Sequence, residues 1–398
     1  MVALLTLFDI FRYGHFVFFV ALHAVMMTGV FLEWRRDKRA FEGEKDGRRA
    51  SETEENSGQK VSVIIPIHNE SRRMDGLLQT LLAQDCPAEI IFVDDRSSDD
   101  GPAKLAQFAR EARKRGVLEC GILTLAENPG PNRKQYALSC GIALAKGDYF
   151  LFTDGDCEVP PGWIRAMARR MRDAKTGAVI GPVFKKKEGK GFFSLYQCYD
   201  HVVRYDYLAG AIGLGAAGGA FGNNLIIRRK ALESIGGYGA VPPSPTEDAA
   251  LISLIRKSGG YRVRAVCLPD AAVETAAERS WRAFVNQTLR WNNGGLFSPD
   301  AVTRFNYNLL MLIIAAGILA IPLLPFIPAL WPMPLAVLIG MLLNNAAAFA
   351  LFRARLPSGG LPVKLGYCAT LLFMPVYLTL MTLMGYAGIK TAWKDEII

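Results

Sequence analysis

Three apolar runs that end in polar residues decide the fold of this chain: VSVIIPIHNE at 61–70, IIFVDDRSSDD at 90–100 and YFLFTDGD at 149–156. A fourth run, AVIGPV, occupies 178–183, and helix-like stretches at 71–84 and 134–146 separate the runs. Short apolar strands that alternate with helices are typical of an α/β fold, a parallel-rich sheet with helices on both faces. Ligands bind such sheets at the carboxyl ends of the strands, so the residues after each run are the first site candidates.

The residues at those strand ends are acidic. Asp94 and Asp95 follow the second run, and Asp154 and Asp156 follow the third with Gly155 between them. Two carboxylates at i and i+2 can converge on one hard divalent cation, and the glycine gives the backbone freedom to do so. A bare Asp-x-Asp is also common in turns, but its place after a strand favours a metal and diphosphate site.

The composition indicates a membrane component. The 398 residues are 51% hydrophobic and 21% charged, which excludes a disordered chain. The formal net charge of +9 would suit nucleic acid or an anionic lipid surface. Because basic residues flank the apolar segments and no nucleic-acid motif is visible, we expect membrane lipids and phosphates as partners and no nucleic acid. The seven cysteines form no Cys-x-x-Cys pair, so zinc fingers and a disulfide framework are not expected.

Three membrane spans are predicted in the C-terminal part. Residues 305–352 contain no charged side chain. As one helix they would extend roughly 72 Å, more than twice a hydrocarbon core of about 30 Å, so the chain must double back. Prolines between 322 and 334 divide the run, which predicts spans at 307–327 and 335–352. A third span is predicted at 365–389.

One more span is predicted near the N-terminus, at 15–32. Its apolar part is long and no small-residue cleavage site follows it, so we expect a retained anchor and not a signal peptide. The basic residues at 35–39, like those at 353–364, predict a cytoplasmic flank and therefore a cytoplasmic central region. The expected protein is integral to the membrane, the cytoplasmic membrane if it is bacterial. The predicted parts are an anchor at 1–34, a charged linker at 35–60, a domain with interfacial helices at 61–303, three membrane helices at 304–390 and a tail at 391–398.

Two further motifs follow in the chain. Thr246-Glu247-Asp248 precedes an apolar stretch, and a capped helix start is its ordinary interpretation. Gln287, Arg290 and Trp291 stand at i, i+3 and i+4, so they share one face of a helix just before the membrane run. An interfacial amphipathic helix would explain them equally well. Their joint occurrence with the acidic strand ends favours function.

Taken in order, these motifs resemble the membrane-bound family 2 glycosyltransferases, the group that includes cellulose, chitin and hyaluronan synthases and several lipid glycosyltransferases. The resemblance covers roughly 61–295 and the flanking helices. It rests on the opening strand and donor loop at 61–70, the nucleotide-base site at 93–99, the metal motif at 153–156, the base motif at 246–248 and the Q-x-x-R-W motif at 287–291. The resemblance implies a GT-A nucleotide-diphospho-sugar transferase domain with about four transmembrane helices.

The resemblance also implies roles for single residues. Asp154 and Asp156 would hold Mg²⁺ or Mn²⁺, and Asp248, beside Glu247, would be the catalytic base. Gln287 and Trp291 would bind the acceptor. The donor, a nucleotide-diphosphate sugar with UDP favoured over GDP, would be bound by Pro66, His68, Asn69, Glu70, Asp94, Asp95, Lys134, Asp154 and Arg290.

The expected function is an inverting transfer of a sugar to a lipid, a lipid-linked molecule or a saccharide at the cytoplasmic face. A processive polysaccharide synthase with translocation is the first alternative, although Thr288 stands where many processive synthases carry Gln or Arg. A non-catalytic scaffold subunit that binds a sugar nucleotide is the second alternative.

Overall fold

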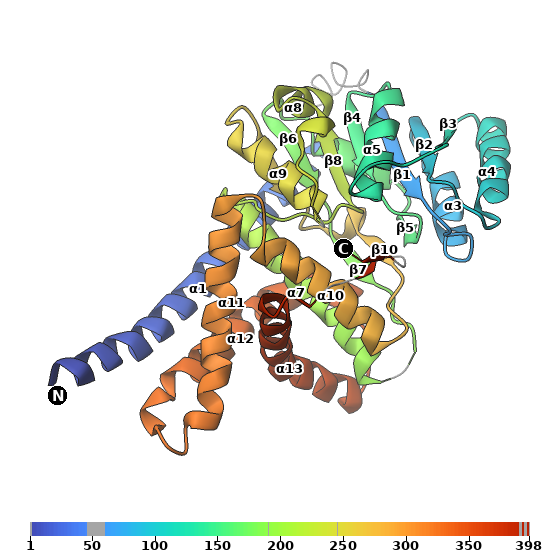
Figure 1. Ribbon diagram of the computed structural model, residues 1–398. Coiled ribbons are helices and arrows are strands. Elements are labelled where there is room, and N and C mark those ends of the chain that lie inside the picture. Colours follow the sequence, from blue (N-terminus) through green and yellow to red (C-terminus); the bar gives the residue numbers. More distant parts are fainter. Residues whose placement is uncertain are drawn as a thin grey trace. The chain divides into compact units, whose positions relative to one another are not determined.

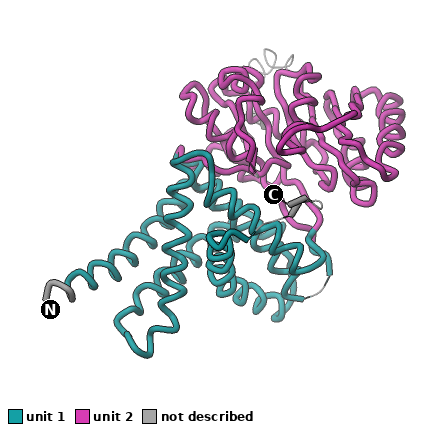
Figure 2. The backbone as a smooth tube through the Cα atoms, viewed as in Figure 1, with its two compact units in different colours: residues 1–31, 187–214, 277–398 teal, residues 32–186, 215–276 magenta. Residues whose placement is uncertain are grey.

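The computed structural model describes residues 2–45, 60–189, 191–244, 246–389, 392–393 and 396–397 (Figure 1). The chain forms two compact units that do not follow chain order (Figure 2). We call residues 32–186 and 215–276 the sheet unit, and residues 1–31, 187–214 and 277–398 the helical unit. The predicted division at 61–303 and 304–390 stays a prediction. Much of the predicted linker, residues 46–59, and part of the predicted tail lie outside the described residues.

The main sheet of the sheet unit confirms the predicted α/β fold. Its strands are β1 (Val61–Ile67), β2 (Ala88–Asp94), β3 (Leu118–Thr124), β4 (Tyr149–Phe152), β6 (Thr176–Ile180), β8 (Leu225–Arg228) and β9 (Arg262–Ala265). They lie in the order β3-β2-β1-β4-β8-β6-β9. β8 runs antiparallel to β4 and β6, and the other neighbours pair in parallel.

A smaller sheet and several helices complete the sheet unit. The smaller sheet has β10 (Val273–Thr275) between β5 (Cys157–Glu158) and β7 (Val183–Lys185). The helices are α3 (Asp75–Leu82), α4 (Gly101–Arg115), α5 (Arg133–Leu144), α6 (Trp163–Arg169), α8 (Arg229–Ser234) and α9 (Glu247–Lys257), with 3-10 turns η1 (Tyr238–Ala240) and η2 (Pro269–Ala271).

The apolar character of the first runs follows from their place in the sheet. Nearly every residue of β1, β2 and β4 is buried, as expected for parallel strands that are covered on both faces. The chain passes from β1 outward to β2 and β3 and then returns to β4 on the other side of β1. The strand order therefore reverses between β1 and β4, and the segments that follow these two strands meet at the reversal.

The helical unit consists of long apolar helices and short connections. Its elements are the first part of α1 (Val2–Lys45), α7 (Phe192–Gly213), α10 (Trp281–Leu296), α11 (Ala301–Ala320), α12 (Pro332–Phe352), α13 (Leu361–Tyr386), the 3-10 turns η3 (Ile321–Leu323), η4 (Pro328–Leu330) and η5 (Arg353–Arg355), and the strands β11 (Ala392–Trp393) and β12 (Glu396–Ile397). Within the described residues, four segments are long and apolar enough to cross a membrane, at the four predicted places: Thr6–Glu42, Ala301–Leu323, Pro328–Arg355 and Leu361–Tyr386.

Helix α1 is longer than the predicted anchor. Its 44 residues correspond to about 66 Å, twice the thickness of a hydrocarbon core. The helix continues through residues 35–45, the first part of the segment predicted as a linker. Contacts with residues far along the chain explain why this part is helical. Glu33 and Asp37, one turn apart, accept hydrogen bonds from the backbone N–H groups of Ala265, Cys267 and Leu268 in the sheet unit.

Candidate functional site

The loops after β1 and β2 are joined by hydrogen bonds. His68 Nδ1 donates to the carbonyl oxygen of Asp95 at 2.6 Å, and the Asn69 N–H donates to Ser97 Oγ at 3.0 Å. The Ser98 N–H donates to Asn69 Oδ1 at 2.9 Å. Asn69 has a φ of 54°, in the left-handed region that asparagine tolerates better than most residues. The two predicted donor loops therefore form one surface at the carboxyl edge of the sheet.

Asp94 and Asp95 are buried and stabilise these loops. Asp94 Oδ1 accepts the Ser97 N–H at 3.1 Å. The Asp95 carboxylate accepts from Arg96 Nε at 2.8 Å and from Asn128 Nδ2, in the segment after β3, at 2.8 Å. The predicted nucleotide-base site is thus built from three adjacent strand ends, those of β1, β2 and β3.

Glu70 connects the donor loop to the metal motif. Its backbone oxygen accepts the N–H groups of Arg73 and Met74, which ends the loop after β1. A side-chain carbon on Gly155 would lie 3.3 Å from Glu70 Cγ and 2.8 Å from Ile67 Cδ1. A larger residue between the two acids of the metal motif would have to displace the Ile67 and Glu70 side chains. Pro66, the first predicted donor residue, lies inside β1 opposite Val93 and is half-buried.

The metal motif presents two half-buried carboxylates. The side chains of Asp154 and Asp156 are 31% and 24% exposed. Asp156 Oδ2 lies 3.9 Å from Arg73 Nη1. Carboxylate oxygens are the donors that Mg²⁺ and Mn²⁺ prefer, and Mg²⁺ commonly uses one or two of them together with substrate phosphates. No cluster of three His, Cys, Asp or Glu side chains suited to a metal occurs in the described part of the chain. An ion held by these two acids would therefore need its remaining ligands from a donor substrate and water.

Lys134 brings the metal motif and the base motif together. Its Nζ donates to Asp154 Oδ1 at 2.6 Å. Burial alone would lower the pKa of the Lys134 amine, but the negative charges of Asp154, Glu247 and Asp248 hold it above its ordinary value of 10.5. Lys134 therefore stays charged at neutral pH, and acids from two distant parts of the chain surround it.

Two backbone N–H groups hold the Asp248 carboxylate. The Gly222 N–H donates to Asp248 Oδ2 at 2.7 Å, and the Ala249 N–H donates to Oδ1 at 2.8 Å. Asp248 is half-buried and Glu247 is buried. Burial, with Glu247 and Asp248 nearby, raises the pKa of Tyr238 well above its ordinary value, so its hydroxyl stays neutral. A carboxylate with a fixed orientation and partial access to solvent is suited to accept a proton.

Asn132 was not among the predicted site residues. Its side-chain oxygen accepts the Gln135 N–H at 3.1 Å and caps α5. Its Nδ2 donates to the Ser244 carbonyl at 2.7 Å and approaches Glu247 Oε2 at 3.4 Å. The spacing Asn132-x-x-Gln135 is a signal for a helix start, which could have located the cap. The link to the base motif crosses more than a hundred residues and has no local signal.

The Q-x-x-R-W motif lies on α10, in the helical unit, as its spacing predicts. Gln287 Nε2 donates to Glu278 Oε1 at 3.0 Å. The Trp291 ring lies 5.3 Å from the His201 ring of α7, centroid to centroid. Gln287, Arg290 and Trp291 are all half-buried. The structure therefore gathers Lys134, Asp154, Glu247 and Asp248 in the sheet unit and places the predicted acceptor residues in the other unit.

Parts of this chain are similar to known proteins. Residues 62–236 match the sequence profile of "Glycosyl transferase family 2". An N-acetylglucosaminyltransferase of Rhizobium meliloti is 28% identical over 246 residues, which are 58% of this chain and 54% of the relative. A beta-monoglucosyldiacylglycerol synthase of Trichormus variabilis is 25% identical over 238 residues, 59% of this chain and 48% of the relative. The chain spans about half the length of these curated relatives.

One solved structure aligns with this chain at a TM-score below 0.5. It is the mannosyltransferase PcManGT from Pyrobaculum calidifontis in complex with GDP-Man and Mn²⁺, with a TM-score of 0.49 and 20% identity. The match covers 96% of this chain and all of the other. The profile match spans β1 to β8 and includes the donor loops and the metal motif. The profile match confirms the resemblance predicted from the motifs: residues 62–236 form a family 2 glycosyltransferase domain.

Proposed function

We propose that this chain is an integral-membrane glycosyltransferase that moves a sugar, with inversion, from a nucleotide-diphosphate sugar to a lipid or lipid-linked acceptor. One observation carries the proposal: Lys134 binds Asp154 of the metal motif and faces Glu247 and Asp248 of the base motif. The relative named as a beta-monoglucosyldiacylglycerol synthase supports a lipid acceptor. A cytoplasmic site is supported by the basic residues at 35–39 and 353–364.

Donor binding would use the carboxyl edge of the sheet. Asp154 and Asp156 would hold Mg²⁺ or Mn²⁺, which when bound neutralises the diphosphate that leaves with the nucleoside. Lys134 keeps Asp154 oriented and adds a positive charge beside it. The loops at 68–70 and 94–98 would bind the nucleotide, with UDP favoured over GDP, and Arg290 would add a second positive group for the diphosphate.

Acceptor activation would use Asp248. Its carboxylate takes the proton of the acceptor hydroxyl while that oxygen forms a bond to the anomeric carbon. The bond from the anomeric carbon to the diphosphate oxygen breaks on the opposite face, so the configuration inverts. Glu247 lies beside this carboxylate, and Gln287 and Trp291 would hold the acceptor through a hydrogen bond and an apolar ring face.

Product analysis tests the proposal. Purified full chain in detergent is given UDP- and GDP-sugars, Mg²⁺ or Mn²⁺ and total membrane lipids, and the products are identified by mass spectrometry. We expect a lipid that carries one added sugar. A ladder of products with many sugars would favour the processive alternative instead.

The variant Asp248→Asn separates an enzyme from a scaffold. Turnover should fall by at least about a hundredfold, the range that general base catalysis contributes, while donor binding measured by calorimetry stays the same. The control is Glu233→Gln, an exposed acid of the same unit that should keep full turnover. Full turnover by Asp248→Asn would refute the role of this carboxylate, and no turnover by the unaltered chain with any donor would favour the scaffold.

A further inference from the structure

A tight turn at residues 221–224 presents the N–H group that holds Asp248. The Asn224 N–H donates to the Phe221 carbonyl at 3.0 Å and closes the turn. Within the turn, the Gly222 N–H donates to Asp248 Oδ2 at 2.7 Å. A side-chain carbon on Gly222 would lie 2.9 Å from the same oxygen and 3.2 Å from Asp248 Cβ. The turn therefore touches the carboxylate directly and, together with the Ala249 N–H, fixes where its oxygens lie.

Asn224 fixes this turn in the interior of the sheet unit. Its side chain is 0% exposed, and both hydrogens of its amide are used: Nδ2 donates to the carbonyls of Pro182 at 2.9 Å and Ala271 at 2.8 Å. Its Oδ1 accepts from Trp163 Nε1 at 2.9 Å. The two carbonyls and the indole N–H allow only one orientation of the amide. Four separate segments of the chain thus meet at one side chain.

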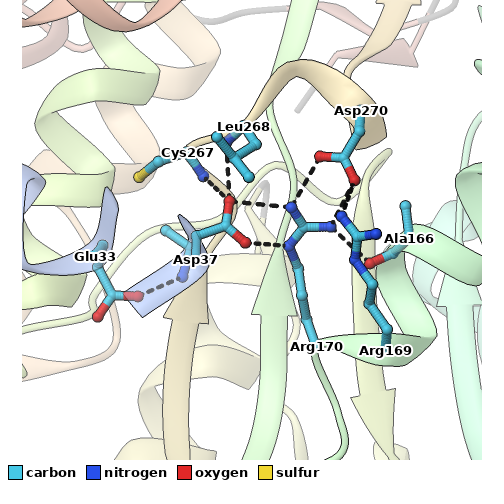
Figure 3. Close-up of polar contacts among 9 residues, drawn as sticks. Glu33, Asp37, Ala166, Arg169, Arg170, Cys267, Leu268 and Asp270 are labelled. Carbon is cyan, nitrogen blue, oxygen red and sulfur yellow. Dashed lines mark hydrogen bonds and ion pairs between the residues drawn. The ribbon is translucent and has the colours of Figure 1, made fainter. Parts of the chain in front are cut away.

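One of those four segments is itself held rigidly. The Ala271 carbonyl ends η2, and its neighbour Asp270 binds Arg169 and Arg170 of the α6 region (Figure 3). Arg170 in turn binds Asp37 at 2.5 Å, and Asp37 accepts the N–H groups of Cys267 and Leu268 just before η2. The carbonyl that receives the Asn224 hydrogen bond therefore lies next to an ionic network that holds η2 in place.

We propose that Asn224 is a positioning residue for Asp248, acting through the 221–224 turn. The inference rests on the proposed role of Asp248 as the base. Asn224 does not touch the reacting atoms. Its loss would take a hydrogen-bond partner from the Ala271 carbonyl and from the Trp163 indole N–H in the interior, while the Pro182 carbonyl would keep only the Val273 N–H. The turn that carries the Gly222 N–H would then be released. A small displacement of a catalytic group is enough to decrease turnover strongly.

The test measures kcat and donor affinity of the full chain in detergent, per folded protein. For Asn224→Ala we expect kcat to fall by about tenfold or more, with the calorimetric Kd for the donor unchanged within about twofold. Gly222→Ala pushes the carboxylate directly and should give the same pattern. Trp163→Phe removes only one of the three side-chain hydrogen bonds of Asn224, so it should give a smaller decrease in kcat. This milder variant keeps the test possible if Asn224→Ala does not fold.

The chain offers a matched control in Gln84. Its amide is also buried, also donates twice, to the carbonyls of Thr80 and Pro160, and also accepts once, from the Ile164 N–H. None of these hydrogen bonds involves the 221–224 turn. Gln84→Ala should lower the melting temperature as Asn224→Ala does, but leave kcat per folded protein unchanged. An equal kcat for both variants would overturn the inference.

A double-mutant cycle separates positioning from general damage. If Asn224 acts through Asp248, adding Asn224→Ala to Asp248→Asn causes no further loss of kcat, because the group being positioned is already absent. If the two losses multiply, Asn224 acts elsewhere and the inference is wrong. Wild-type turnover by Asp248→Asn alone would instead refute the proposed function, and the inference with it.

Discussion

Replacing Asp37 with alanine tests whether the extension of α1 is part of the folded sheet unit. The Asp37 side chain is 3% exposed and binds Arg170, which is 5% exposed, through two oxygens at 2.5 and 3.0 Å. It also accepts the N–H groups of Cys267 and Leu268, each at 2.9 Å. Figure 3 shows this carboxylate between the guanidinium group and the two N–H groups. Alanine would remove the one carboxylate that accepts from all of these donors.

The expected loss follows from what remains around Arg170. Removing one partner of a buried ion pair costs about 3–5 kcal/mol, because the other charge is left uncompensated. Arg170 keeps Asp270 at 2.9 Å, whose side chain is 26% exposed, and the Ala166 carbonyl at 2.7 Å. We therefore expect the lower end, about 3 kcal/mol. For a unit of roughly two hundred residues this corresponds to a decrease in Tm of about 6–12 °C.

The assay is thermal unfolding of the full chain in detergent, followed by intrinsic fluorescence. The control is Glu42→Gln in the same helix, because Glu42 pairs with Lys38 at 3.5 Å on the exposed face and both side chains are about half exposed. Surface pairs of this kind contribute about 0.5 kcal/mol or less, so Tm should hardly change. If Asp37→Ala shifts Tm no more than Glu42→Gln does, residues 35–45 behave as a tether and our reasoning is wrong.

Three further changes have defined outcomes. Lys134→Met should lower Tm by the same amount at pH 6 and at pH 9. Because the pKa of Lys134 is raised, its stabilising charge is complete below pH 10.5 and is lost only as the pH rises past that value. A Tm difference that vanishes by pH 9 would contradict the raised pKa of Lys134. In the presence of Mg²⁺ or Mn²⁺, Asp156→Asn should bind the donor, measured by calorimetry, as weakly as the unaltered chain does after a chelator has removed the metal. If donor binding by the variant still depends on the metal, Asp156 is not a metal ligand. Gly29→Leu should lower the Tm in detergent, because a side-chain carbon at Gly29 would overlap Gly210 of α7. Gly14→Leu on the same helix meets open space and should leave the Tm unchanged. Equal effects of the two variants would refute the close approach of the two helices.

The strands and the candidate acids were predictable because their signals are local. Buried parallel strands need continuous apolar runs, so β1, β2 and β4 stand out without any partner in view. The acids of the metal motif follow directly from the end of β4, and the four apolar helices follow from length and hydropathy. Where a local signal was weak, as for the two-residue strand β5 or the antiparallel β8, the pattern alone did not find the element.

What the sequence determined by itself was the type of sheet, the four helices that are long and apolar enough to cross a membrane, and the residue types available for metal and proton chemistry. Each of these depends on neighbours along the chain. Tertiary structure alone decided which of these residues meet. Lys134 at the start of α5 faces Asp154 after β4 and Asp248 at the start of α9 because the fold brings these three segments together. The extension of α1 is ordered because Asp37 finds Arg170 far along the chain. Contacts between residues separated by a hundred or more positions leave no periodic trace, because they depend on how whole strands and helices pack.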